Sequence, residues 1–169
     1  LAYFGTVGAG KQFEWVIEAW RSAREREPAT ALVVIGAKPS VALGEVEARW
    51  YRELGYQENL EASLALQGID VLVLPFVDGV SERRSSFMAG LAHGCAVVTT
   101  LGPATGSALR EATFYRGVPV DCLKLSAATA SLVCDEAECH RLGRAAQAVY
   151  DERYDWPHLA ARLVRRLES

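Results

Sequence analysis

The sequence lacks any apolar run of the length that a membrane span requires. The longest such run, residues 71–77, contains a proline and is far shorter than the roughly 20 residues of a transmembrane helix. The sequence also lacks an excess of charge, since 18 Lys and Arg residues face 21 Asp and Glu residues, so it has no global electrostatic reason to bind nucleic acid. With 50% hydrophobic and 23% charged residues, disorder, collagen and coiled coil are excluded. We expect one domain over residues 1–169, because domains commonly have roughly 100–200 residues.

Cysteine is scarce and irregularly spaced, at positions 95, 122, 134 and 139. This usage is typical of a reducing compartment rather than of a disulfide framework, and it predicts a cytoplasmic protein. Cys134, Cys139 and His140 form an incomplete set of zinc ligands, so we expect inert thiols and no metal site. The chain begins abruptly at Leu1, without an initiating Met or a signal-peptide pattern, which predicts a fragment of a two-domain protein.

Continuous apolar segments alternate with helical segments along the whole chain. The strand-like segments are residues 1–5, 31–36, 70–75, 96–100 and, more weakly, 118–120. The first helical pattern begins after Gly10 and runs to about Glu27. The others cover residues 43–54, 58–67, 85–93, 126–133, 135–150 and 156–167, the last with Asp155 as its N-cap. This alternation predicts an α/β fold with a doubly wound parallel sheet and helices on both faces. Ligands of such sheets bind beyond the carboxyl ends of the strands, so the loops after residues 5, 36, 75 and 100 are the places to search.

The first of these loops is glycine-rich and ends in a lysine at the start of a helix. Gly5, Gly8 and Gly10 let backbone N–H groups approach an anion, and Lys11 adds a full positive charge, which favours phosphate as the ligand. The loop is not a Walker A motif, because Gln12 follows the lysine where a hydroxyl residue is needed, and it does not match G-x-G-x-x-G. The alternative is a tight turn with a solvated lysine.

The second loop leaves a buried strand and carries several charged and hydroxyl residues. These are Asp78, Gly79, Ser81, Glu82, Arg83, Arg84, Ser85 and Ser86. The arginines and serines at a helix N-terminus predict a second anion site, so that both loops together would hold a diphosphate. Asp78 and Glu82 are suited to accept hydrogen bonds from the hydroxyls of a sugar. The alternative is that the serines cap the helix while Arg83 pairs with Glu82 in solvent.

The remaining polar groups carry less specific signals. Residues 99–106 form a third loop, which either closes over a ligand or merely turns the chain. His93 stands alone, and a structural hydrogen bond is the more common role for such a residue than general-base catalysis. No Ser/His/Asp or Cys/His arrangement can be assembled, so hydrolysis by nucleophilic catalysis is not supported.

The order of these segments resembles a known family. The resemblance rests on Phe4-Gly5, a lysine six positions after that glycine, the segments 32–36 and 70–76, Asp78-Gly79, the segment 91–100 and Tyr154-Asp155-Trp156. Together they resemble the C-terminal half of a GT-B glycosyltransferase, most closely the retaining group 1 (family 4) class. The resemblance covers nearly the whole chain.

The resemblance implies a Rossmann-like domain that binds a nucleotide-sugar donor, with the acceptor bound by an N-terminal domain outside this sequence. By resemblance Lys11 matches the lysine that contacts the donor diphosphate, and Thr6 stands where many members carry an arginine. Asp78 falls near the first carboxylate of the family's E-x7-E element, which contacts the donor sugar, whereas Ala89 occupies the second position. From charge and position, Arg83 and Arg84 are candidates to replace the missing arginine.

The main hypothesis is therefore a metal-independent, retaining glycosyltransferase that uses a nucleotide-diphosphate sugar as donor substrate and needs no cofactor. Its candidate catalytic residues are Asp78 and Arg84, and its candidate donor-binding residues are Gly5, Thr6, Lys11, Gly79, Ser81, Glu82, Arg83, Ser85 and Ser86. The alternatives are a non-catalytic nucleotide-sugar-binding or scaffold protein and a sugar-nucleotide epimerase, although the acid/base pair of an epimerase is not visible. The last helix is basic and amphipathic, which suits either a peripheral membrane contact or packing against the second domain.

Overall fold

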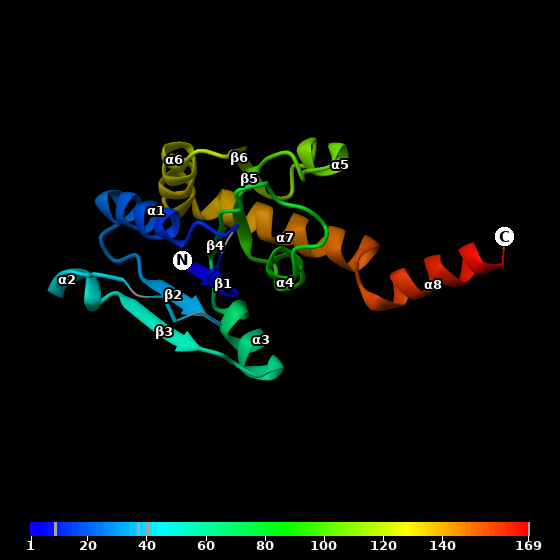
Figure 1. The fold of residues 1–169 in the computed structure, drawn as a ribbon, viewed down its shortest axis with the longest axis horizontal. Coiled ribbons are helices and arrows are strands. Elements are labelled where there is room, and N and C mark those ends of the chain that lie inside the picture. Colours follow the sequence, from blue (N-terminus) through cyan, green and yellow to red (C-terminus); the bar gives the residue numbers. More distant parts are fainter. Residues whose placement is uncertain (9, 37, 40, 169) are drawn as a thin grey trace.

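The fold is a parallel six-stranded sheet with helices around it (Figure 1). The computed structural model describes residues 1–8, 10–36, 38–39 and 41–168. Its strands are β1 (Ala2–Phe4), β2 (Leu32–Ile35), β3 (Tyr51–Gly55), β4 (Val71–Leu74), β5 (Ala96–Leu101) and β6 (Arg116–Pro119). Their order in the sheet is β3-β2-β1-β4-β5-β6, and every pair is parallel. The chain therefore winds outward in both directions from β1 and β4, which are neighbours at the topological switch point.

The helices cover both faces of this sheet. They are α1 (Phe13–Arg26), α2 (Glu45–Ala48), α3 (Asn59–Gln67), α4 (Ser85–Ala92), α5 (Ser107–Arg110), α6 (Cys122–Val133), α7 (Glu136–Arg153) and α8 (Trp156–Leu167). Helix α1 leads from β1 toward one edge, and α4 leads from β4 toward the other. Because such crossovers are right-handed, α1 and α4 lie on opposite faces, where α1 packs with α6 and α4 packs with α7.

The core explains why the apolar segments form strands. All four residues of β4 are buried, as expected for a strand covered by helices on both faces. Trp20 of α1 is fully buried and donates a hydrogen bond from Nε1 to the carbonyl of Thr30, 2.9 Å away, which anchors the helix to the chain before β2. The predicted Rossmann-like α/β fold class is confirmed, as are the strands over 1–5, 31–36, 70–75 and 96–100.

The predicted helix over residues 43–54 is wrong. Only Glu45–Ala48 is helical there, and Tyr51–Gly55 forms β3, which pairs in parallel with β2 at the edge of the sheet. An edge strand is half-solvated, so its charged residues give it no continuous apolar signature, and pairing with β2 decides its conformation. The short helix α5 was not predicted, and α6 begins at Cys122 rather than near 126 because the side chain of Asp121 caps it.

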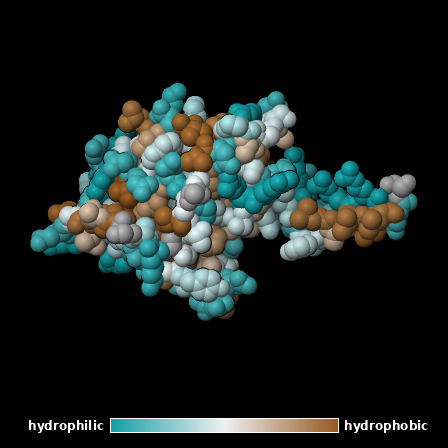
Figure 2. Space-filling view, in the orientation of Figure 1, coloured by the Kyte–Doolittle hydropathy of each residue, from teal (hydrophilic) through white to brown (hydrophobic). Residues whose placement is uncertain are grey.

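Helix α8 extends away from the rest of the molecule (Figures 1 and 2). None of its residues is buried, and an apolar stripe runs along one side, made by Trp156, Leu159, Leu163, Val164 and Leu167. The side chain of Asp155 accepts a hydrogen bond from the His158 backbone, which confirms the predicted N-cap. None of the helices in the described residues is long and apolar enough to cross a bilayer.

Candidate functional site

The loops after β1 and β4 meet at the switch point of the sheet. The backbone N–H of Val77 donates to the carbonyl of Gly10 over 3.2 Å, and Lys11 forms an isolated β-bridge with Phe76. On the β1 side, the Tyr3 hydroxyl donates to the carbonyl of Thr6 over 2.7 Å. The two predicted loops are thus held together by backbone contacts, which gives their charged side chains a defined separation.

Lys11 lies over Gly5, the residue that follows β1. A Cβ atom on Gly5 would stand 2.7 Å from the Lys11 amine and 4.0 Å from Oγ of Ser86. Gly5 also has a φ of +129°, a backbone conformation that side chains disfavour, so the conformation calls for glycine. Burial, and next the positive charge of Arg84, lower the pKa of Lys11. The negative charge of an anion placed here would oppose both effects, because it favours the protonated amine.

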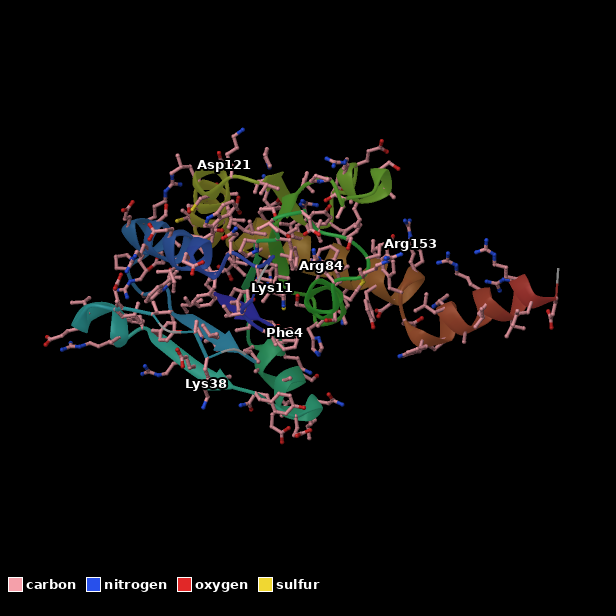
Figure 3. The ribbon with its side chains drawn as sticks, viewed as in Figure 1. Phe4, Lys11, Lys38, Arg84, Asp121 and Arg153 are labelled. Atoms are coloured by element: carbon pink, nitrogen blue, oxygen red, sulfur yellow. The ribbon has the colours of Figure 1, made fainter. Side chains whose placement is uncertain are left out.

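Arg84 supplies the second cation of the site. Its Cζ atom lies 4.6 Å from the centroid of the Phe76 ring, a cation–π contact that limits where the guanidinium can go. Nη2 of Arg84 also donates to Oδ1 of Asp78 in a short ion pair that is partly exposed to solvent. Figure 3 shows Lys11 and Arg84 near one another at the middle of the molecule, in agreement with their electrostatic interaction.

The amino end of α4 faces the same place. Arg84 is the N-cap residue and no side chain caps the helix, so the proposed capping by Ser85 and Ser86 is not what the structure shows. The first amides of a helix lack acceptors within it, and here they follow directly on Arg84. Ser85 is exposed and Ser86 is buried next to the Gly5 and Lys11 contact. The arrangement suits a diphosphate.

The third predicted loop packs against the second one. Gly79 has a φ of +90°, and a Cβ atom on it would collide with the backbone amide of Gly102. The Thr100 hydroxyl donates to the carbonyl of Phe76 over 2.6 Å and stands 2.8 Å from the Phe76 amide nitrogen, which donates back. The N–H of Ala104 donates to the carbonyl of Asp78 over 2.8 Å. Residues 99–106 therefore support the backbone that carries Asp78.

Three predicted site residues point elsewhere or outward. Glu82 accepts a hydrogen bond from the Tyr154 hydroxyl over 2.9 Å, so this carboxylate lies toward the junction of α7 and α8 and does not pair with Arg83. Arg83 is exposed, as is Thr6, whereas Ser81 contributes its carbonyl to the Arg84 amide over 3.1 Å.

His93 has the structural role that was expected. Its Nε2 lies 2.8 Å from Oγ of Ser63, and its Nδ1 lies 2.8 Å from the carbonyl of Ala89, so both ring nitrogens have hydrogen-bonding partners. Phe76, Thr100 and Tyr154 contribute to the site region and were not predicted, because a lone aromatic or hydroxyl residue in the sequence carries no sign of what it will contact.

A cavity of about 820 Å³ lies at the opposite end of the sheet. Leu1, Ala31, Asp70 and Gly94 line it, and these residues precede β1, β2, β4 and β5 or lie next to them. It is therefore remote from the two cations, and we place the candidate site at the carboxyl ends, where donors and positive charge converge.

The cysteines do not form a cluster. Burial raises the pKa of Cys95 to about 12 and that of Cys139 to about 11, which makes both thiols poor nucleophiles at neutral pH. Cys122 and Cys139 are partly buried, and Cys134 is exposed. Among residues 1–8, 10–36, 38–39 and 41–168, no group of three or more His, Cys, Asp or Glu side chains is placed to hold a metal ion.

Solved structures with the same fold bear on this geometry. The C-terminal domain of the group 1 glycosyltransferase LpcC from Francisella tularensis superposes with a TM-score of 0.74 at 17% identity, over 92% of this chain and 85% of that one. The chain has the C-terminal-domain fold of group 1 glycosyltransferases. Anabaena Alr3699/HepE in complex with UDP gives a TM-score of 0.77 at 14% identity, over 99% of this chain and 48% of that one.

WaaG, a glycosyltransferase involved in lipopolysaccharide biosynthesis, superposes with a TM-score of 0.71 at 18% identity, over 96% of this chain and 46% of that one. The chain thus spans about half the length of HepE and WaaG. Neither a family model nor a curated protein matches the sequence.

Proposed function

We propose that this chain is the donor-binding domain of a glycosyltransferase that transfers a sugar from a nucleotide-diphosphate sugar to an acceptor. The observation that carries the proposal is the convergence of Lys11, Arg84 and the amino end of α4 at the switch point of the sheet. The HepE structures with UDP and with UDP-glucose support this assignment, because they contain such ligands in a protein of the same fold.

Within this proposal the cations act on the leaving group. As the bond between the sugar and the diphosphate breaks, negative charge grows on the phosphate oxygens, and Lys11, Arg84 and the α4 amides stabilise it more than they stabilise the intact donor. This chemistry needs no metal ion. Asp78 is the proposed hydrogen-bond acceptor for donor hydroxyls. The resemblance to the retaining class supports a reaction in which the anomeric configuration is kept.

The acceptor is proposed to bind to a second domain. The chain matches about half of HepE and of WaaG, and among its described residues the carboxylate next to the cations, that of Asp78, is already paired with Arg84. We therefore expect this chain alone to bind the donor without transferring sugar. Full turnover by the 169-residue chain would contradict the two-domain mechanism.

A second candidate is a protein that binds nucleotide sugars without reacting them. It is favoured by Ala89, which occupies the α4 position where the resemblance implies a second carboxylate, and by the pairing of Asp78 with Arg84. A protein that includes the second domain would distinguish the two candidates, because only the enzyme would transfer or hydrolyse a sugar that the chain binds.

The proposal is tested by calorimetric titration of the chain with UDP, GDP, ADP and their common sugar conjugates. Saturable binding of one nucleotide, weakened both by Lys11→Ala and by Arg84→Ala, is the expected result. Arg83→Ala is the matched control, because this neighbouring arginine is exposed and lies outside the Phe76 and Asp78 contacts. Equal losses for the three variants would mean that the loop attracts anions only through its overall charge.

A further inference from the structure

Within the candidate site, one of the two cations already has an anionic partner. The carboxylate of Asp78 pairs with Arg84, while the guanidinium rests against the ring of Phe76. A diphosphate that is to use Arg84 must therefore take the place of this carboxylate or share the guanidinium with it. The ion pair is partly exposed, which makes the exchange inexpensive and reversible.

The geometry allows the carboxylate to leave without movement of the loop. The backbone at Asp78 is fixed, because its carbonyl accepts the N–H of Ala104 over 2.8 Å and the following Gly79 packs against Gly102. The side chain of Asp78 is 46% exposed and has room to change rotamer. A displaced carboxylate then stays within the site and needs a new hydrogen-bond donor.

The intact donor and the nucleoside diphosphate differ in what they offer this carboxylate. A sugar brings hydroxyl groups that can donate to it. A nucleoside diphosphate brings none at that position, and its terminal phosphate carries an additional negative charge, because the second proton of a phosphate dissociates near about pH 6. The displaced carboxylate is accommodated in the first case and repelled in the second.

We infer that Asp78 is the residue by which this site distinguishes the intact nucleotide-sugar donor from the nucleoside diphosphate that remains after transfer. The inference rests on the proposed function and adds to it a role in product release. With the sugar bound, Asp78 contacts the hydroxyls and Arg84 holds the diphosphate. Once the sugar has left, the carboxylate returns to Arg84 and competes with the product for it.

Glu82 provides a matched comparison in the same loop. Its carboxylate has the same charge and lies four residues further along the chain, but it accepts the hydrogen bond of Tyr154 and makes no ion pair with Arg84. If only the overall charge of the loop matters, Asp78 and Glu82 should contribute alike. If the pairing matters, only Asp78 should affect the choice between donor and product.

The test is the ratio of two dissociation constants, for UDP and for UDP-glucose, measured by calorimetry on the 169-residue chain. The GDP and ADP pairs are titrated in parallel, and the most tightly bound pair is used. Asp78→Asn removes the charge and keeps the size. We expect it to tighten nucleoside diphosphate binding by about fivefold, the upper range for a partly exposed ion pair, and to leave the sugar conjugate unchanged or weaker.

Two further variants locate the effect. Glu82→Gln should leave the ratio unchanged. In an Arg84→Gln background, Asp78→Asn should tighten nucleoside diphosphate binding less than it does in the unmodified chain, because there is no guanidinium at position 84 for the lost carboxylate to release. An undiminished gain there would show simple repulsion and would overturn the exchange at Arg84. Circular dichroism and thermal unfolding of each variant verify that the chain is folded.

The outcomes separate this inference from the proposed function. Failure of the unmodified chain to bind any of the nucleotides or conjugates would overturn both. Two outcomes would overturn the inference alone. In the first, Asp78→Asn changes the affinities for the diphosphate and for the sugar conjugate by the same factor; in the second, it weakens binding of the diphosphate. Either would leave Asp78 as a residue that merely positions Arg84.

Discussion

The two ends of the sheet differ in how their charged groups are arranged. At the carboxyl end, Lys11 and Arg84 lie together on loops that hydrogen-bond to one another. At the amino end, the cavity of about 820 Å³ is lined by groups of both signs: Asp70 precedes β4, and Glu136 and Arg144 both belong to α7. Two positive side chains next to the first amides of a helix indicate an anion site, whereas the volume of the amino-end cavity does not.

The loops of the carboxyl end are also more closely packed. Gly79 leaves no space for a side chain beside Gly102, and the Thr100 hydroxyl is bonded twice to Phe76. This packing, together with the contact between Arg84 and the Phe76 ring, restricts where Arg84 can lie before a ligand arrives. Preorganised charges of this kind lose little free energy to rearrangement when they bind or act on a ligand.

The largest expected effect is on stability, from Gly79→Ala. The new Cβ would collide with the Gly102 amide at a φ of +90°, so we expect unfolding to become easier by about 2–4 kcal/mol. Urea unfolding measures this change. Gly106→Ala is the control, because no atom lies within 4 Å of its Cβ position, and it should change the free energy of unfolding by less than about 0.5 kcal/mol. Similar midpoints for both variants would show that the carboxyl-end loops are not tightly packed.

The next effect is on binding, from Lys11→Ala. Loss of a charged hydrogen-bond donor should weaken UDP binding by about 1.5–3 kcal/mol in a calorimetric titration. Arg144→Ala at the amino-end cavity removes the same charge and should leave the affinity unchanged. If both variants lose affinity equally, the comparison between the two ends fails as a guide to the binding site.

The pH dependence of UDP binding should reflect the lowered pKa of Lys11. Burial and Arg84 lower this pKa from its ordinary value of 10.5, so the folded protein loses this proton at a lower pH than an exposed lysine does. As the pH rises, the affinity for UDP should therefore start to fall before pH 10.5 is reached. Above the lowered pKa, the affinity should fall by up to about tenfold per pH unit.

Lys11→Arg is the matched variant, because a guanidinium stays protonated throughout this range and its binding should be nearly independent of pH. An equal decline in the unmodified chain and in this variant would assign the pH dependence to another group.

The smallest effect is expected from Tyr154→Phe. This change removes the hydrogen bond to Glu82 at the outer side of the carboxyl-end loops, which should lower stability by about 0.5–1 kcal/mol in urea unfolding. UDP affinity should change by less than about twofold, since the cations keep their contacts with Phe76 and Asp78. A larger loss of UDP affinity would show that the contact between Tyr154 and Glu82 contributes to donor binding.

Much of the fold follows from the sequence, because strands buried on both faces must be apolar throughout. This rule predicted β1, β2, β4 and β5. It could not predict β3, whose residues Arg52, Glu53 and Leu54 are exposed and which becomes a strand through its pairing with β2.

The candidate site was predicted in the same partial way. Glycines, Lys11 and Arg84 at the ends of predicted strands indicated an anion site, since the chemistry of such loops is local. The alternative reading, a pair between Glu82 and Arg83, is wrong, because Glu82 accepts a hydrogen bond from Tyr154 at the end of α7 and Asp78 pairs with Arg84.

The sequence by itself determined the α/β class, the positions of the buried strands and the presence of basic residues in two loops, because each depends on the residues within one segment. The tertiary structure alone decided the strand order β3-β2-β1-β4-β5-β6, and with it the meeting of the β1 and β4 loops. It also decided which carboxylate neutralises Arg84. These outcomes depend on which segments become neighbours, and packing in three dimensions sets that.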